Sequence, residues 1–230
     1  MKNNRFQTVV VALVGAAIVF GLFRFNYHPD YYNNLYDRYL IVNMLALIWA
    51  PMATVLLVFR ASPEAFGFAA PKSRRVWVVT GVLFVGAFFL VMLASRMPAF
   101  QHYYPLFKWY RGFEPAFEGY PATNPFTTAP WLMVYALASY GMYLFCWEFF
   151  FRGFLLFGLQ RSLGPVIAIL LQGIAFGLLH WGKPEMLPSF AGGVILGALA
   201  LSARSFLPAF VLHWALSISL DVMVILYRSH

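Results

Sequence analysis

The stretch WLMVYALASYGMYLFCWEFFFRGFLLFGL, residues 131–159, is almost wholly apolar, yet it carries a carboxylate, Glu148, and a guanidinium, Arg152. A run of this length exceeds the roughly 20 residues that cross a hydrocarbon core about 30 Å thick. Because backbone polar groups in lipid must bond to one another, the run is predicted to be a helix. A charged side chain at the bilayer centre costs at least about 2.5–3.5 kcal/mol on insertion scales. We therefore expect Glu148 and Arg152 to face a protein interior and to have a function there.

Further apolar runs occur on both sides of this stretch. The chain is 62% hydrophobic and 10% charged, with a mean hydropathy of +0.72, which is far more apolar than a soluble domain. The composition predicts an all-α fold, a polytopic transmembrane helix bundle of about seven helices with a polar site among the last four. The other expected spans are 8–23, 39–59, 76–95, 165–181, 188–203 and 206–227.

Three regions can be distinguished along the chain. Residues 1–95 contain spans without intramembrane charge and are predicted to be an N-terminal scaffold. Residues 96–130 are rich in Tyr, Trp and Phe, which favour the headgroup zone, so this connection is predicted to lie along the membrane surface. Residues 131–227 form the expected functional core, because all the intramembrane ionisable residues fall there.

Charge indicates the orientation of the chain and the kind of partner it has. The net charge is +8, but no basic face or soluble module is present to bind nucleic acid, so no nucleic-acid partner is expected. The predicted partner is the lipid bilayer. Basic residues gather before the first span and in the 60–75 connection, which places the N-terminus in the cytoplasm by the positive-inside rule. These residues are Lys2, Arg5, Arg60, Lys72, Arg74 and Arg75.

Three of the last four spans each carry polar residues at helical spacing. Glu148 and Arg152 are four residues apart and can pair on one helix face. The pair alone is equally well explained as a buried ion pair that holds helices together. Two further stripes have members four and eight residues apart: Gln172, Phe176 and His180 in one span, and His213, Ser217 and Asp221 in another.

The three stripes are best accommodated if they face one another around a small wet cavity. Two imidazoles and nearby carboxylates form a site for activating water, with or without a metal. Two histidines and a carboxylate are a common catalytic zinc set, which makes His180 and His213 candidate ligands of a divalent metal such as zinc. Without metal, a carboxylate and a histidine can act as general base and electrostatic stabiliser. Cys146 is the sole cysteine, which excludes an intramolecular disulfide or a thiolate cluster.

Three ordered motifs within residues 131–225 resemble a known family. They are Glu148-x-x-x-Arg152-Gly153, Phe176-x-x-x-His180, and His213-x-x-x-Ser217 after Ser205-Phe206-Leu207-Pro208. This set is similar to the signature of the CAAX-protease and bacteriocin-processing (CPBP, or Abi) intramembrane proteases. The ordered set is far more specific than any one of the motifs.

The resemblance implies a fold, an activity and a location. It implies a transmembrane bundle whose site is sunk in the membrane, opens toward the cytosolic side, and hydrolyses a peptide bond in a hydrophobic or lipidated, CAAX-like peptide. A glutamate and a histidine would activate the attacking water, and metal participation stays open. Bacterial relatives act in peptide maturation, self-immunity and signalling, so the bacterial cytoplasmic membrane is the expected location. The candidate catalytic residues are Glu148, Arg152, His180 and His213, and the candidate supporting residues are Ser217 from the third motif together with Asp221, Glu185 and Gln172 from the sequence itself.

Two positions depart from the family pattern. The family shows a Glu-Glu doublet before the arginine and gives the catalytic role to the first glutamate, but here that position is Trp147. The third motif usually ends in Asn or Asp, where this chain has Ser217. Either Glu148 has become the base, or Asp221 or Glu185 supplies it, or the chain does not cut.

Two alternatives to a peptidase follow from the same residues. The first is a non-catalytic protein of the same fold that acts as a membrane immunity or scaffold protein, which Trp147 favours. The second is a proton- or ion-coupled transporter, which could also use intramembrane Glu, Arg and His. The chain shows no paired half-repeats with matching interrupted helices, which disfavours the transporter.

Overall fold

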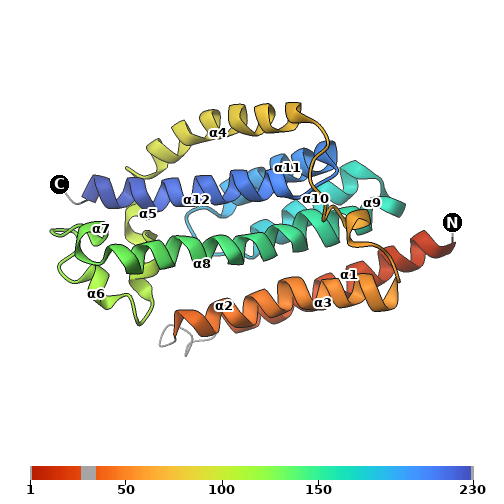
Figure 1. The fold of residues 1–230 in the computed structure, drawn as a ribbon, viewed down its shortest axis with the longest axis horizontal. Helices are drawn as coiled ribbons and strands as arrows, with labels where there is room; N and C mark the ends of the chain where they lie inside the picture. Colours follow the sequence, from red (N-terminus) through yellow and green to blue (C-terminus); the bar gives the residue numbers. More distant parts are fainter. Residues whose placement is uncertain (1, 27–34, 229–230) are drawn as a thin grey trace.

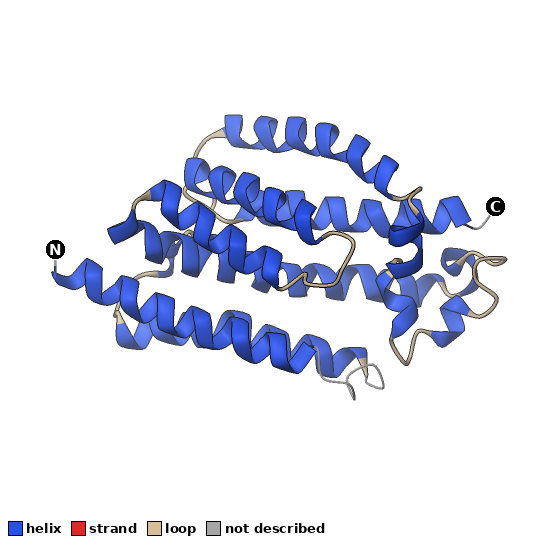
Figure 2. Ribbon diagram, turned by 180° about the vertical axis from the view of Figure 1, so that it is seen from behind, coloured by secondary structure: helices blue, strands red, loops and turns tan. Residues whose placement is uncertain are grey.

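The computed structural model describes residues 2–26 and 35–228, and the regular elements in this part of the chain are all helices (Figure 2). The chain is an all-α helix bundle, as the sequence predicts. The elements are α1 (Lys2–Asn26), α2 (Tyr36–Met44), η2 (Leu45–Trp49), α3 (Ala50–Ala53), η3 (Thr54–Val58), η4 (Pro63–Phe66), α4 (Arg74–Ala94), α5 (Pro98–Tyr103), η5 (Leu106–Trp109), α6 (Glu114–Phe117), α7 (Pro125–Thr128), α8 (Pro130–Glu148), η6 (Phe149–Leu155), α9 (Leu156–Leu163), α10 (Pro165–Leu178), α11 (Met186–Ala203) and α12 (Leu207–Arg228).

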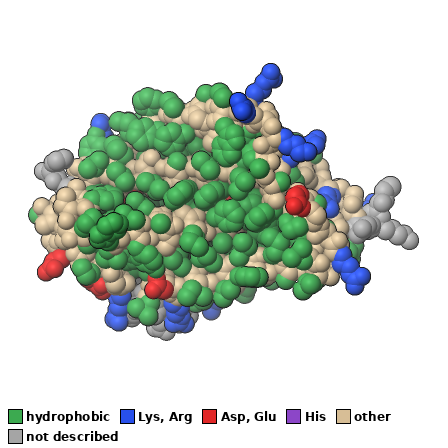
Figure 3. Space-filling model, in the orientation of Figure 1, with side chains coloured by type: hydrophobic (Ala, Val, Ile, Leu, Met, Phe, Trp, Pro, Cys, Tyr) green, Lys and Arg blue, Asp and Glu red, His purple; other side chains and the backbone are tan. Residues whose placement is uncertain are grey.

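Within the described residues, six continuous helical stretches are long and apolar enough to cross a membrane. They are Asn4–Asn26, Tyr36–Val58, Arg74–Ala94, Pro130–Leu163, Met186–Ala203 and Leu207–Arg228. The long helices run in roughly parallel rows, so that α1 begins at one end of the bundle and α12 ends at the other (Figure 1). Hydrophobic side chains cover the middle of the visible face (Figure 3), as expected for a surface in contact with lipid.

The stretch that runs through α8, η6 and α9 forms the centre of the bundle. In its most apolar window 89% of the residues are buried, against 6% for α4, which lies at the periphery. Helix α12 packs on α8 and α4, while α9 packs on α1 and α10. The helix that carries the intramembrane carboxylate and guanidinium is therefore the one most shielded from lipid.

Helix α10 is shorter than the span expected at 165–181. It begins after Gly164 at the helix-starting Pro165 and ends at Leu178. Its 14 residues extend only about 21 Å at about 1.5 Å per residue, less than a hydrocarbon core about 30 Å thick. Irregular backbone at membrane depth is tolerated where it is buried in protein or lines a cavity. The short helix thus leaves His180 on a turn inside the bundle.

Small residues bring α10 and α11 into close contact. A Cβ on Gly193 would lie 3.1 Å from the Gly173 Cα atom, and one on Gly197 would lie 2.7 Å from Gln172 Nε2. Gln172 Nε2 donates hydrogen bonds to the carbonyls of Ile169, at 2.9 Å, and Gly193, at 2.8 Å. Glycines here permit the backbone approach that membrane helices use for packing.

The aromatic segment 96–130 folds into short helices at one end of the bundle, where α12 ends (Figure 1). Lys108 Nζ donates to the carbonyls of Gln101, His102 and Tyr104 at 3.3, 2.7 and 2.8 Å. Arg228 Nη1 also donates to the Gln101 carbonyl, at 2.9 Å. These bonds gather the first half of the segment over the end of α12.

Candidate active site

Glu148 is the last residue of α8, and the helix continues directly into the π-helical segment η6. Its side chain is fully buried. One carboxylate oxygen, Oε1, accepts from Arg152 Nη1 at 3.0 Å and from His213 Nδ1 at 2.7 Å. The other oxygen, Oε2, has no hydrogen-bond partner among the described residues. The carboxylate is thus held on one side and free on the other.

Arg152 is also fully buried and forms the ion pair that its spacing from Glu148 predicts. Its guanidinium carbon lies 4.1 Å from the centre of the Phe176 ring, which adds a cation–π contact. The Nε and Nη2 atoms have no hydrogen-bond partner in the described part of the chain. Buried polar groups are nearly always hydrogen-bonded, so these donors are suited to a water or a substrate oxygen.

The two histidines each donate from one ring nitrogen and keep the other free. His180 Nδ1 lies 2.8 Å from the Phe176 carbonyl oxygen, and His213 Nδ1 lies 2.7 Å from the Glu148 carboxylate. A carbonyl or an ionised carboxylate can only accept, so Nδ1 carries the proton in both neutral imidazoles. The unprotonated Nε2 atoms are left as acceptors, because the partner of one nitrogen decides the state of the other.

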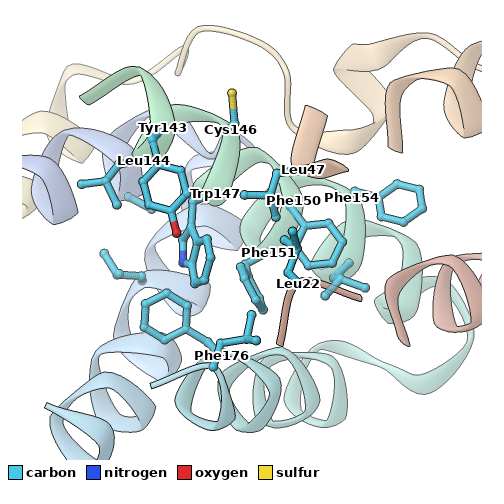
Figure 4. Close-up of a cluster of buried hydrophobic side chains, with 14 of the residues drawn as sticks. Leu22, Leu47, Tyr143, Leu144, Cys146, Trp147, Phe150, Phe151, Phe154 and Phe176 are labelled. Atoms are coloured by element: carbon cyan, nitrogen blue, oxygen red, sulfur yellow. The ribbon is translucent and has the colours of Figure 1, made fainter. Parts of the chain in front are cut away.

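Trp147 takes the position next to Glu148 and forms an aromatic wall. It is buried, and its ring centroid lies 5.1 Å from that of Phe151, 5.9 Å from that of Phe176 and 6.1 Å from that of His180. Trp147, Phe151 and Phe176 cluster together in Figure 4. The indole Nε1 has no acceptor among the described residues. Trp147 therefore packs His180 in place and leaves one N–H donor free.

Two cavities meet at the histidines. The first, of about 320 Å³, is lined by Trp147, His180 and His213 at its inner end, and by residues of the aromatic segment at its outer end. The second, of about 450 Å³, is a groove along α4, α11 and α12 that also reaches His180 and His213. We call them the end chamber and the lateral groove. Lys183 lines both, and burial lowers the pKa of its ammonium group.

Residues 125–219, which hold these side chains, match the protein-family model described as "Rce1-like: Type II CAAX prenyl endopeptidase Rce1-like". The match covers less than half of the chain and includes the three polar motifs. The resemblance to CAAX proteases is thereby confirmed. The protein is an integral multi-pass membrane protein in which residues 125–219 are similar to a protease family. Neither the curated proteins nor the solved structures give a significant match to the chain.

The four residues expected to support the site lie in different places. Ser217 and Glu185 line the lateral groove. Burial raises the pKa of the Glu185 carboxyl group. Asp221 is buried and accepts from the Leu106 backbone N–H at 3.1 Å, so it holds the aromatic segment. Gln172 bonds α10 to α11, as described above. None of the four has a hydrogen bond to Glu148 among the described residues.

The candidate site lacks a complete set of zinc ligands among the described residues. No group of three or more His, Cys, Asp or Glu side chains in the described residues could hold a metal ion. Catalytic zinc usually has three protein ligands plus water, and here only His180 and His213 offer free imidazole nitrogens. The residues present do not fit the expected zinc site, and no catalytic step is derived through a metal.

Sequence reasoning did not identify the walls of the end chamber. His102, Tyr103 and Trp109 contribute from the aromatic segment, and Tyr143 contributes from α8. The aromatic richness of residues 96–130 was visible in the sequence. It was assigned to the membrane surface, and only the structure shows that part of it turns inward.

Proposed function

We propose that the chain is an intramembrane endopeptidase that hydrolyses a peptide bond in a hydrophobic or lipidated, CAAX-like peptide. The supporting observation is the Glu148 carboxylate, which binds Arg152 and His213 through one oxygen and keeps the other free of protein partners. A general base must be charged, oriented and able to accept a proton. Arg152 and His213 hold the carboxylate charged and oriented, and its free oxygen can accept the proton.

The free polar atoms suggest how the reaction proceeds. Glu148 takes a proton from water while the water oxygen forms a bond to the carbonyl carbon of the peptide. His180 Nε2, an acceptor, orients that water. The oxyanion is stabilised by the unpaired indole N–H of Trp147, which lines the end chamber. The C–N bond then breaks, and Glu148 returns its proton to the leaving amine.

The experiment that tests this proposal is a comparison of peptide termini in membranes that contain the wild type or Glu148→Gln at matched protein levels. Termini that occur only with the wild type are expected. Glu185→Gln is the matched control, because it removes a partly buried carboxylate that lies in the lateral groove. Loss of cleavage in Glu185→Gln alone would assign the base to Glu185. Identical termini with wild type and Glu148→Gln, together with inert His180→Ala, would favour the non-catalytic scaffold or immunity protein.

The proposal includes the membrane in which the protein lies and the side of its N-terminus. We place the chain in the cytoplasmic membrane of a bacterium with its N-terminus in the cytoplasm, because Lys2 and Arg5 precede the first span. The hydrophobic or lipidated peptide and the bilayer are its proposed partners. Nucleic acid is not among them.

A further inference from the structure

Lys183 lies beside the wall that the two cavities share. It follows His180 by three residues on the turn between α10 and α11, and it lines both the end chamber and the lateral groove. The backbone of this turn is hydrogen-bonded: the Lys183 N–H donates to the His180 carbonyl at 3.0 Å, and the Lys183 carbonyl accepts from the Met186 N–H at 3.2 Å. The side chain therefore extends from a fixed backbone next to the proposed reaction site.

The ammonium group of Lys183 has no anionic partner among the described residues. Its Nζ atom lies 5.8 Å from the centre of the Tyr103 ring, whereas the ion pairs between described residues all involve Glu148. Burial lowers the pKa of the ammonium group, because the charged form loses hydration, and Glu185 offsets only part of this effect. A carboxylate at Nζ would supply the missing counter-charge.

Lys108 of the aromatic segment shows how a lysine with a structural role is satisfied in this protein. Its Nζ donates to three backbone carbonyls within residues 101–104, and it lines neither the end chamber nor the lateral groove. Lys183 differs in both respects, since it lines both cavities and its ammonium group has no such bonds within the described chain. Charged groups withdrawn from water are paired as a rule. The partner of Lys183 is therefore expected to arrive with a ligand.

The lining of the end chamber is one-sided in charge. Among the described residues it includes no Asp or Glu, and Glu185 lines only the lateral groove. The unpaired indole N–H of Trp147 adds a further donor. Besides tyrosines, the ionisable side chains of the lining are His102, His180, Lys183 and His213. Because opposite charges attract and like charges repel, the chamber favours an anionic group over a cationic one.

We propose that Lys183 is a specificity-determining residue, and that it binds a carboxylate of the peptide segment that enters the end chamber. A hydrogen bond from an ammonium group to a carboxylate is roughly twice as strong as one between neutral groups. A peptide can supply this carboxylate from its C-terminus or from an Asp or Glu side chain. The proposal rests on the proposed peptidase function, because it takes the segment in the end chamber to be part of the substrate.

The test is the binding of three peptides to full-length Glu148→Gln in detergent, a background in which the proposed mechanism consumes no peptide. Each peptide carries a dansyl label and an S-farnesylated cysteine. The first ends in a free carboxylate, the second in an amide, and the third in glutamate followed by an amide. Fluorescence anisotropy measures Kd below the melting transition of every variant.

At least one of the two carboxylate peptides should bind about 10- to 100-fold more tightly than the neutral amide, and which one does so identifies the source of the carboxylate. Adding Lys183→Met should abolish this preference, while Lys183→Arg should retain most of it. The neutral amide should bind Lys183→Met at least as tightly as before, which excludes a folding defect. Glu185→Gln is the matched control: it changes a charge two residues away that does not line the end chamber, so the preference should remain.

Equal affinity for the three peptides, including no detectable binding of any, would overturn the proposal. A preference for the carboxylate that persists in Lys183→Met would overturn it too. Cleavage by the wild type is measured separately. A preference that depends on Lys183, without cleavage of any peptide, would leave the binding site standing and count against the peptidase. Glu148-dependent cleavage without any preference would do the opposite.

Discussion

The buried Glu148–Arg152 pair predicts a distinctive pattern of stability in single and double variants. The two charged atoms are 3.0 Å apart, and both side chains are fully buried. Arg152→Met leaves the carboxylate without its cation, and Glu148→Gln leaves the guanidinium without its anion. Breaking a buried pair in this way costs about 3–5 kcal/mol. For a chain of this size about 1 kcal/mol shifts Tm by roughly 2–4 °C, so each single variant should melt about 6–20 °C below the wild type.

The double variant Glu148→Gln/Arg152→Met should recover most of this loss. Neither position then carries a charge, and replacing a whole buried ion pair by neutral groups is often close to neutral in stability. Thermal melting in detergent, followed by tryptophan fluorescence, measures all four proteins. Proteolysis should stay absent in the double variant despite its recovered stability, which separates the chemistry of Glu148 from its role in folding. Additive losses, with the double variant melting lowest, would refute the reasoning.

Three further predictions concern neighbouring groups. Trp147→Phe keeps the aromatic wall but removes the free indole N–H, so kcat should fall by about 10²–10³ with little change in KM; an unchanged kcat would remove Trp147 from the oxyanion site. Chelation with 1,10-phenanthroline should leave the cleavage rate unchanged, because His180 and His213 are one ligand short of a zinc site; loss of activity that zinc restores would contradict this. Asp221→Leu leaves the Leu106 N–H unpaired at a cost of about 1–3 kcal/mol, so hydrogen exchange should accelerate at residues 104–110 and not in α10.

The grouping of Glu148, Arg152 and His213 could be predicted because the apolar helices around them offer few other groups that can form hydrogen bonds. A carboxylate, a guanidinium and an imidazole in the membrane have few groups other than one another to bond to. The structure shows these hydrogen bonds, although it does not test the catalytic roles. The helical character of the chain followed from composition for a related reason, since only helices or closed barrels satisfy the backbone in lipid.

The hydrogen-bond partners of residues on one helix face were harder to predict than the fact that these residues share a face. Asp221 lies eight residues from His213, and Gln172 lies eight from His180. Residues with this spacing share a face but stand about 12 Å apart along the axis. One bonds the aromatic segment and the other bonds a glycine-rich neighbour. Neither residue lines the end chamber or the lateral groove, so the helical stripe did not predict these partners, which depend on elements far away in the chain.

The burial of Phe66 in the connection at residues 63–69 and the early end of α10 could not be inferred from local patterns. Phe66 is buried because residues near 154 and 161 cover it, about 90 positions further along the chain. Apart from Gln172 and His180 the expected span 165–181 is apolar, and periodicity gave no reason for the helix to end at Leu178. His180 on the turn after α10 packs against Trp147, which is a tertiary contact.

For the proposed peptidase, the wall that His180 and His213 share would give a cleaved peptide two different directions of departure. A bond broken at this wall leaves one fragment in the lateral groove, whose apolar lining favours a lipid-anchored piece. The other fragment lies in the end chamber and can diffuse into water. Once the new amine and the new carboxylate move apart into different surroundings, they no longer meet at Glu148. The architecture would thus make hydrolysis effectively irreversible by separating its products, without any need for a moving lid.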